Sequence, residues 1–300
     1  MPAQILVRYG ELALKSAPVR REFESHLRRN ILDQFVREGL TGRLRADHGH
    51  LYVEVDDGPR AAHVLQRVFG ITSVSLVHEV PSERGSIRDR LLELAEPRLR
   101  SGASFAVRAR RTGGQHPFTS QELARDLGGD VLERFADRAL RVDLERPEVE
   151  LFVEVRGPRT YLSFDRLRGP GGLPLGVAGR LIALVDGPRG ALGAFLMMKR
   201  GCRLSLVTVP PGDSLAREVL GRFDPSAPIA ASEPEPAAWG RRLGELGAES
   251  HAEGIVLPMR VEEYPDARAR WGDLVLFSPT VGLTDAEVED RWKTAAQLTA

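Results

Sequence analysis

Apolar and polar residues alternate in three N-terminal segments, as they do in half-buried strands: Gln4–Tyr9, Leu51–Val55 and Ile71–Val80. From Val19 to Val36 the apolar residues instead recur every four positions, which predicts one face of a long helix. Ala61–Val68 predicts a shorter amphipathic helix, and Arg43–Asp47 leaves room for a further strand. This order predicts a split βαβ, ferredoxin-like domain over residues 1–80.

A second mixed unit of the α+β class is expected over residues 81–167. Its predicted helices are Ile87–Leu99 and Ser120–Phe135, and its predicted strands are Ser104–Ala109, Val149–Val155 and Thr160–Phe164. The segment that follows, residues 168–180, is the richest in Gly and Pro in the chain. Its composition predicts an interdomain linker.

Strands and helices then alternate to the end of the chain, over residues 181–300. The predicted strands are Leu181–Val185, Arg203–Val207, Ile255–Met259 and Leu274–Phe277. The predicted helices are Ala191–Arg200, Ser214–Phe223, Pro236–Leu246 and Asp285–Ala296. Such alternation predicts an α/β domain with a doubly wound parallel sheet.

Charge is distributed unevenly, although 42 basic and 42 acidic residues give no net charge. Residues 1–45 carry a net +4 and residues 224–300 a net −7, so a basic partner surface is expected near the N-terminus. The single cysteine, Cys202, excludes an intrachain disulfide and a multi-thiolate metal site. No apolar run reaches the roughly 18 residues of a membrane span, and the start has no signal pattern, so we expect a cytoplasmic protein without a membrane partner.

A cluster of cations surrounds the predicted start of the helix at Ser120. Arg108, Arg110 and Arg111 end a strand, His116 lies in the following loop, and Arg125 lies in the first turns of the helix. Helix N-termini faced by arginines bind phosphate groups, and Thr119 or Ser120 could cap this one. A solvated strand edge beside an ordinary capped helix explains the same residues, and the local pattern leaves both interpretations open.

Several separated motifs resemble those of the tRNA 4-thiouridine synthetase (tRNA sulfurtransferase) family, in the order of that family. They are Arg8–Ser16, Arg20–Phe23, Phe105–Arg111, Phe118–Ser120, Leu127-Gly128 and Met198–Cys202. The resemblance implies a ferredoxin-like domain, an RNA-binding THUMP domain and an ATP-binding PP-loop domain. It also implies binding of the acceptor stem and single-stranded 3′ end of tRNA.

With that resemblance, the basic residues of the first two domains are expected to contact RNA. The expected RNA-binding residues are Lys15, Arg20, Arg21, Arg108, Arg110, Arg111, His116, Ser120 and Arg125. For the first three, local charge pairs with Glu22 and Glu24 are an equally simple explanation. The expected partners are tRNA and a tRNA-modifying enzyme, and the sequence leaves open whether the chain forms a homodimer.

The third domain departs from the family at the turn after its first strand. The family has a Ser-Gly-Gly-x-Asp-Ser loop there, whereas this chain has Asp186, Gly187, Pro188, Arg189 and Gly190. Pro188 cannot donate a backbone N–H, and Asp186 places a carboxylate where phosphates would lie. We therefore expect a degenerate nucleotide loop in which Asp186 caps the next helix, although Arg189 could restore positive charge.

Two further losses favour a non-catalytic protein. Residues 254–260 continue as an apolar strand without the family's Thr-Gly loop, and no cysteine accompanies Cys202 for sulfur transfer. We expect a tRNA-binding protein that assists tRNA modification and holds no cofactor. The alternative is an active ATP-dependent tRNA uridine sulfurtransferase that takes sulfur from another protein, with ATP as its cofactor. Asp47-His48-Gly49-His50 predicts a hairpin turn, and no metal site is expected.

Overall fold

The computed structural model describes residues 2–11, 15–47, 50–114, 116–271 and 274–299. Contacts divide the chain into two compact units, which are described separately here. The first unit consists of Met1–Leu6, Tyr52–Pro59 and Ser75–Leu167; the second consists of Val7–Leu51, Arg60–Val74 and Arg168–Ala300. The domain boundaries at residues 80, 167 and 180 stay a prediction. Among the described residues, no helix is both long and apolar enough to cross a lipid bilayer.

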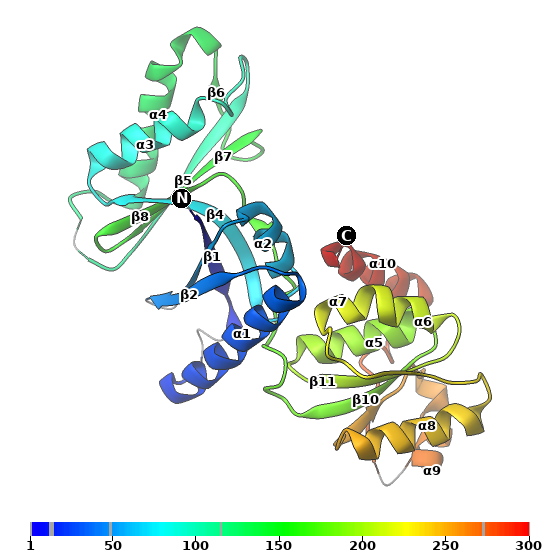
Figure 1. Cartoon of the computed structure of the whole chain (residues 1–300). Helices are drawn as coiled ribbons and strands as arrows, with labels where there is room; N and C mark the ends of the chain where they lie inside the picture. The colour runs from blue at the N-terminus through cyan, green and yellow to red at the C-terminus, as the bar shows by residue number, and fades with distance from the viewer. Residues whose placement is uncertain (1, 12–14, 48–49, 115, 272–273, 300) are drawn as a thin grey trace. The chain divides into compact units, whose positions relative to one another are not determined.

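The N-terminal elements follow the predicted ferredoxin-like order. They are β1 (Ala3–Tyr9), α1 (Ala17–Arg37), β2 (Gly42–Asp47), β3 (His50–Val55), α2 (Gly58–Leu65) and β4 (Ile71–Pro81) (Figure 1). The strand order is β2-β3-β1-β4, so the two halves of the split βαβ motif interleave. The turn predicted at His48-Gly49 lies outside the described residues.

The first unit continues the sheet from β4 to β8, β7, β5 and β6. Its elements are α3 (Arg84–Ala95), β5 (Ser104–Thr112), α4 (Ser120–Arg134), a 3₁₀ turn (Ala136–Arg138), β6 (Arg141–Val142), β7 (Val149–Arg156), β8 (Arg159–Ser163) and β9 (Leu167–Arg168). Apolar side chains on one face of β5, β7 and β8 pack against α3 and α4. The hydrophobic core that they form includes Phe105, Leu127 and Leu151. Strands β6 and β9 were not predicted because two residues are too few to show an alternation.

The C-terminal part of the second unit is a parallel sheet, as predicted, and its strand order is β12-β11-β10-β13-β14. The strands are β10 (Arg180–Val185), β11 (Arg203–Thr208), β12 (Ile229–Ala231), β13 (Gly254–Val256) and β14 (Val275–Phe277). The helices are α5 (Pro188–Lys199), α6 (Gly212–Ser214), a π-helical turn (Leu215–Leu220), α7 (Gly221–Phe223), α8 (Pro236–Glu249), α9 (Tyr264–Trp271) and α10 (Asp285–Ala296), with 3₁₀ turns at Val261–Glu263 and Gln297–Thr299.

Two separate cores show that helices cover both faces of this parallel sheet. One core joins α5 and α10 to the sheet through Phe195 and Trp292, and the other joins α8 to it through Leu243.

The predicted strand Ile255–Met259 was too long, since β13 ends at Val256, two residues before Pro258. A proline has no N–H for a strand ladder and disfavours its continuation. Helix α9 was not predicted because its sequence has no apolar stripe and none of its residues is buried.

The Gly-rich segment predicted as a linker is held in place by backbone hydrogen bonds. Gly70 N–H donates to Gly171 O at 2.8 Å, and Gly171 N–H donates back to Ile71 O at 2.8 Å. Gly172 has a φ of +72°, and a Cβ on it would lie 2.1 Å from the carbonyl oxygen of Lys199. The glycines therefore permit close packing of the backbone, and this composition does not give a flexible tether here.

Helix α1 packs against the C-terminal part of the second unit. Its Asn30 amide donates to Leu175 O at 3.2 Å and accepts from Arg203 at 3.3 Å. Beside these polar contacts, Phe69, Phe195 and Phe223 form a buried aromatic cluster with ring centres 5.2–5.4 Å apart. Phe69, which follows α2, and the parallel-sheet domain thus share one core within this unit.

Candidate nucleic-acid interface and nucleotide turn

Arg111 organises the loop that leads from β5 to α4. Its guanidinium donates to the carbonyl oxygens of His116 at 3.3 Å and Phe118 at 2.9 Å. The His116 ring stacks on Phe118, with ring centres 5.6 Å apart. The His116 Nε2 atom is buried, has no hydrogen-bond partner among the described residues, and lies 3.3 Å from the Cβ position of Gly114. The fold therefore brings Arg111 and His116 together, and their contacts hold the conformation of this loop.

The α4 helix begins with a capping box. Thr119 is the N-cap: its hydroxyl accepts from the Glu122 N–H at 3.2 Å, and the Glu122 carboxylate accepts from the Thr119 N–H at 2.7 Å. These bonds lower the pKa of Glu122, and the charges of Arg125 and Arg111 lower it further. Two cations therefore flank this N-terminus, where Ser120 is the first helical residue. The cap satisfies only some of the free N–H groups of the first turn.

Arg108 and Arg110 lie two positions apart on β5, so they share one face of the sheet, but their surroundings differ. Arg108 is tied down: it pairs with Glu150 at 2.9 Å and donates to Leu144 O at 2.7 Å. Arg110 is exposed and has no ion-pair or hydrogen-bond partner among the described residues. Arg125 is 77% exposed and reaches only its neighbour Asp126, at 3.5 Å. Arg110 and Arg125 are thus the most available to a polyanion among the cations of this unit that were predicted to contact RNA.

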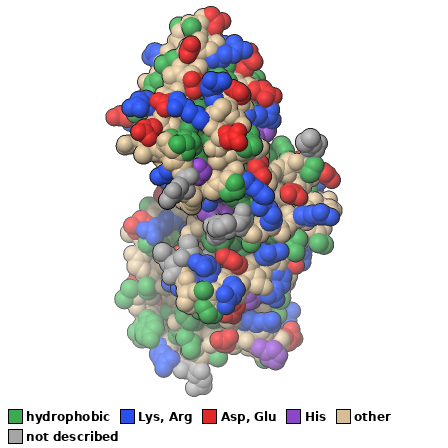
Figure 2. Space-filling view, turned by 90° about the vertical axis from the view of Figure 1, so that its left-hand side faces the viewer, with side chains coloured by type: hydrophobic (Ala, Val, Ile, Leu, Met, Phe, Trp, Pro, Cys, Tyr) green, Lys and Arg blue, Asp and Glu red, His purple; other side chains and the backbone are tan. Residues whose placement is uncertain are grey.

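The surface over α3 and α4 is mixed in charge. Basic and acidic side chains are interspersed over the upper part of Figure 2, where these helices lie. A shallow groove between them is lined by Arg88 and Arg134 together with Glu93, Asp130 and Glu133. Because the acids offset the arginines there, the loop ahead of α4 is a better candidate for phosphate contact than the groove.

The three cations near the start of α1 belong to the other unit. Lys15 and Arg21 are exposed and Arg20 is half-buried. Within the described part of the chain they form no ion pair with Glu22 or Glu24, so the local charge-pair explanation finds no support. Glu24 instead accepts a hydrogen bond from the Tyr9 hydroxyl at 2.6 Å, and burial together with Glu24 raises the pKa of Tyr9.

The turn after β10 does not have the form of a phosphate-binding loop. Gly187 is the N-cap of α5 and Pro188 its first residue, so the expectation that Asp186 caps the helix was wrong. Asp186 instead folds back over the first turn, where its Oδ1 lies 3.0 Å from the Cβ position of Gly190. This places a carboxylate beside the helix N-terminus, where a phosphate would otherwise be favoured.

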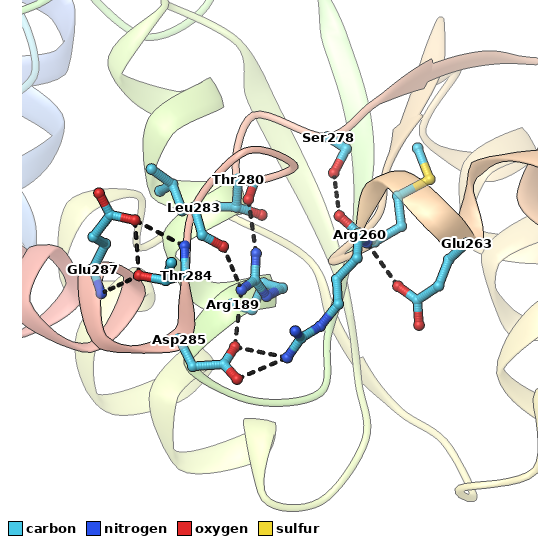
Figure 3. A network of polar contacts seen from close by, with 10 residues as sticks. Arg189, Arg260, Glu263, Ser278, Thr280, Leu283, Thr284, Asp285 and Glu287 are labelled. Carbon is cyan, nitrogen blue, oxygen red and sulfur yellow. Dashed lines mark hydrogen bonds and ion pairs between the residues drawn. The ribbon is translucent and has the colours of Figure 1, made fainter.

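Arg189 does not replace the missing positive charge, because its guanidinium is engaged elsewhere (Figure 3). It donates to Thr280 O at 2.7 Å, to Leu283 O at 2.8 Å and to Asp285 at 2.9 Å, and its side chain is 12% exposed. Asp285 also binds Arg260 through both oxygens, at 2.7 and 2.9 Å. Sequence reasoning missed these partners, since no local pattern links residues separated by more than 90 positions.

A second loop closes against the same turn. A Cβ on Gly212 would lie 1.9 Å from the carbonyl oxygen of Val185, and Val209 N–H donates to that oxygen at 3.0 Å. Backbone therefore packs directly against the Val185-Asp186 peptide. Together with the carboxylate of Asp186 and the engaged Arg189, this packing does not fit the triphosphate of ATP.

The single thiol is also unsuited to chemistry. Cys202 is buried, and its Sγ donates to Ala178 O at 3.2 Å. Burial raises the pKa of the thiol, with the charge of Glu253 adding to the effect. A buried thiol with a raised pKa is a poor nucleophile because the thiolate is the reactive form.

Comparison with known domain families assigns about the first half of the chain. Residues 4–75 match the ThiI ferredoxin-like domain, and residues 85–165 match the THUMP domain. The chain is a THUMP-domain protein of the tRNA sulfurtransferase-like family. The family resemblance inferred from the sequence motifs is therefore confirmed.

Curated relatives of the THUMP-domain protein are longer than it is. The "Probable tRNA sulfurtransferase" of Methanosarcina acetivorans is 37% identical over 225 residues, which cover 72% of this chain and 54% of that relative. The protein of the same name from Methanocaldococcus jannaschii is 32% identical over 224 residues, covering 72% and 58%. The chain thus spans about half the length of the curated relatives that it matches.

Two solved structures resemble the THUMP-domain protein along its whole length. PH1313 from Pyrococcus horikoshii is 26% identical with a TM-score of 0.79, over 97% of this chain and 99% of that one. A 4-thiouridine synthetase solved as an RNA complex with bound ATP is 21% identical with a TM-score of 0.76, over 100% of this chain and 86% of that one. These likenesses confirm the predicted fold of ferredoxin-like, THUMP and parallel-sheet domains.

Proposed function

We propose that this protein binds tRNA at the acceptor stem and 3′ end, without catalysing sulfur transfer, and that it assists the modification of tRNA. The THUMP domain and the likeness to a synthetase crystallised with RNA support the RNA-binding part. The available cations Arg110 and Arg125 beside the α4 N-terminus, and Lys15, Arg20 and Arg21 before and within α1, supply the phosphate contacts.

The observation that carries the non-catalytic part is the position of Asp186. Its carboxylate lies against the first turn of α5, and the nearest cation, Arg189, is held by Asp285 and two carbonyl oxygens. A polyphosphate at this turn would meet a negative charge and find no free positive one. ATP is therefore not a cofactor of this chain under the proposal.

The alternative is an active ATP-dependent tRNA uridine sulfurtransferase supplied with sulfur by another protein. The name of the curated relatives, "Probable tRNA sulfurtransferase", favours it. The two functions differ in whether the chain releases pyrophosphate from ATP when tRNA is present. They agree on tRNA binding, so two measurements are needed.

The first measurement is fluorescence anisotropy of labelled full-length tRNA titrated with the whole chain at several salt concentrations. We expect saturable binding whose affinity falls as salt rises, since phosphate contacts release counterions. No binding at low salt would contradict the RNA-binding proposal.

The second measurement is tRNA-stimulated release of pyrophosphate from labelled ATP, with the Methanocaldococcus jannaschii relative as the positive control. We expect no release above background, and release comparable to the control would establish the alternative.

A further inference from the structure

A hollow of about 580 Å³ lies at the carboxyl ends of β10 and β13 in the second unit. The sheet order reverses between these two strands, because β11 lies on one side of β10 and β13 on the other. Crevices at such a switch point are the usual ligand sites of open α/β sheets. The volume falls within the range of small-molecule sites.

The walls of the hollow are apolar and aromatic. Leu184, Leu257 and Met259 form buried parts of the lining. Trp239 of α8 and Trp271 of α9 complete it, with their rings stacked 6.2 Å apart at 27°. Arg270 places its guanidinium carbon 6.0 Å from the centre of the Trp239 ring, so this wall already attracts a cation.

Three carboxylates, those of Asp186, Glu263 and Asp266, line the hollow against the single cation Arg270. In the part of the chain that the structure describes, none of the three forms an ion pair. Glu263 accepts only the backbone N–H of Arg260, at 2.7 Å. Burial raises the pKa of Asp186 and the charge of Glu263 raises it further, although a backbone hydrogen bond and the charge of Arg189 oppose the shift.

Two nearby arginines, Arg189 and Arg260, form ion pairs with Asp285, so Arg270 is the cation of the lining that faces the three carboxylates. The acids are also too dispersed for an inorganic ion: no group of three or more His, Cys, Asp or Glu among the described residues is placed to hold a metal. The hollow therefore combines an excess of negative charge with aromatic walls, which is the chemistry that recognises organic cations.

We propose that this hollow binds an organic cation, with an amine or guanidinium group among Asp186, Glu263 and Asp266 and the rest of the molecule against Trp239 and Trp271. The same chemistry is offered by a free small molecule and by an arginine side chain of a partner protein. The proposal does not depend on tRNA binding and concerns different residues.

The test is isothermal titration calorimetry of the whole chain with three probes. Agmatine represents a free guanidinium compound, an acetylated Gly-Arg-Gly amide represents an arginine side chain of a protein, and ATP represents a polyanion. We expect saturable binding of agmatine, of the peptide or of both, and none of ATP. Tighter binding of the peptide than of agmatine would assign the cation to a partner protein, and the reverse would assign it to a free small molecule.

The charge contribution is tested with the double variant Asp186→Asn/Asp266→Asn, which keeps the side-chain volumes. We expect its affinity for the bound cation to fall at least about tenfold. The matched control Asp137→Asn/Asp290→Asn removes the same charge from exposed positions outside the hollow and should change the affinity less than about twofold. The proposal is overturned if neither cation binds saturably, if ATP binds as tightly, or if the two double variants behave alike.

Discussion

The side-chain amide of Gln34 donates a hydrogen bond to the carbonyl oxygen of Phe223 at 3.1 Å, which joins helix α1 to the parallel-sheet domain. The same amide donates to Arg222 O at 2.9 Å, and Gln34 is 4% exposed. The C-terminal domain therefore holds a helix near whose start three of the proposed RNA-binding residues lie. This contact gives the C-terminal domain a structural role that does not require ATP.

Replacing Gln34 with Ala is expected to destabilise the protein by about 1–3 kcal/mol, because a buried carbonyl group, that of Phe223, and a half-buried one, that of Arg222, lose their donor. Urea unfolding of the whole chain measures the change. Gln121→Ala, at an exposed position of α4, is the control and should have little effect. Equal stability of the two variants would mean that the Gln34 bonds contribute nothing.

Arg110 and Arg108 are adjacent on one strand face but are expected to respond differently to replacement by Ala. Arg110→Ala should leave stability unchanged and reduce the slope of log affinity for tRNA against log salt by about one, because one phosphate contact is lost. Arg108→Ala, in contrast, should lower the free energy of unfolding by about 1 kcal/mol, since it breaks the ion pair with Glu150 and the hydrogen bond to Leu144 O.

Anisotropy titrations over a salt series, with urea unfolding in parallel, separate these two effects. Arg241→Ala, an exposed position of α8, serves as the control for a general loss of charge. An unchanged slope for Arg110→Ala would remove that residue from the proposed RNA interface.

Arg189→Ala is expected to destabilise the chain by about 2–3 kcal/mol, because three hydrogen bonds of a half-buried guanidinium are lost together. The thermal midpoint of the whole chain should fall accordingly, whereas Arg217→Ala, an exposed arginine of the π-helical turn, should leave it within the error. A normal midpoint for Arg189→Ala would favour the view that this cation is held free for an anionic ligand.

Asp186→Asn is expected to stabilise the protein near neutral pH and to have no effect in acid. Burial raises the pKa of Asp186 in the folded chain, so the folded state binds more protons than the unfolded state between the two pKa values. The free energy of unfolding of the wild type should therefore fall as pH rises from the unfolded-state pKa of Asp186 to its folded-state pKa, and it should stay low at higher pH.

Unfolding curves from about pH 3 to pH 8 compare wild type with Asp186→Asn, and the gain should vanish below the ordinary carboxyl pKa, where both states of the wild type are protonated. Asp290→Asn, an exposed acid of α10, is the control and should follow the wild type across the series. A gain for Asp186→Asn that does not vary with pH would show that the carboxylate charge is not its cause.

Much of the fold could be predicted because each main element has a strong local pattern. The fourfold recurrence of apolar residues in α1 and the alternation in β4 predicted both to within a few residues. Short elements escaped prediction, as β12 did, because three residues carry too little pattern. The candidate site was predictable only in part: the cations ahead of α4 were evident, but that Arg108 is paired and Arg110 is available depends on Glu150 and Leu144.

By itself, the sequence determined the element order, the family of the first two domains and the loss of the serine-rich loop after β10, since all three are properties of neighbouring residues. Tertiary structure alone decided which charges are available. Thr280 and Asp285 lie 91 and 96 positions from Arg189, yet the fold brings them to its guanidinium. Hydrogen bonds between distant segments leave no periodicity in the chain. The engagement of Arg189 and the grouping of Asp186 with Glu263 and Asp266 therefore emerge only once the chain is folded.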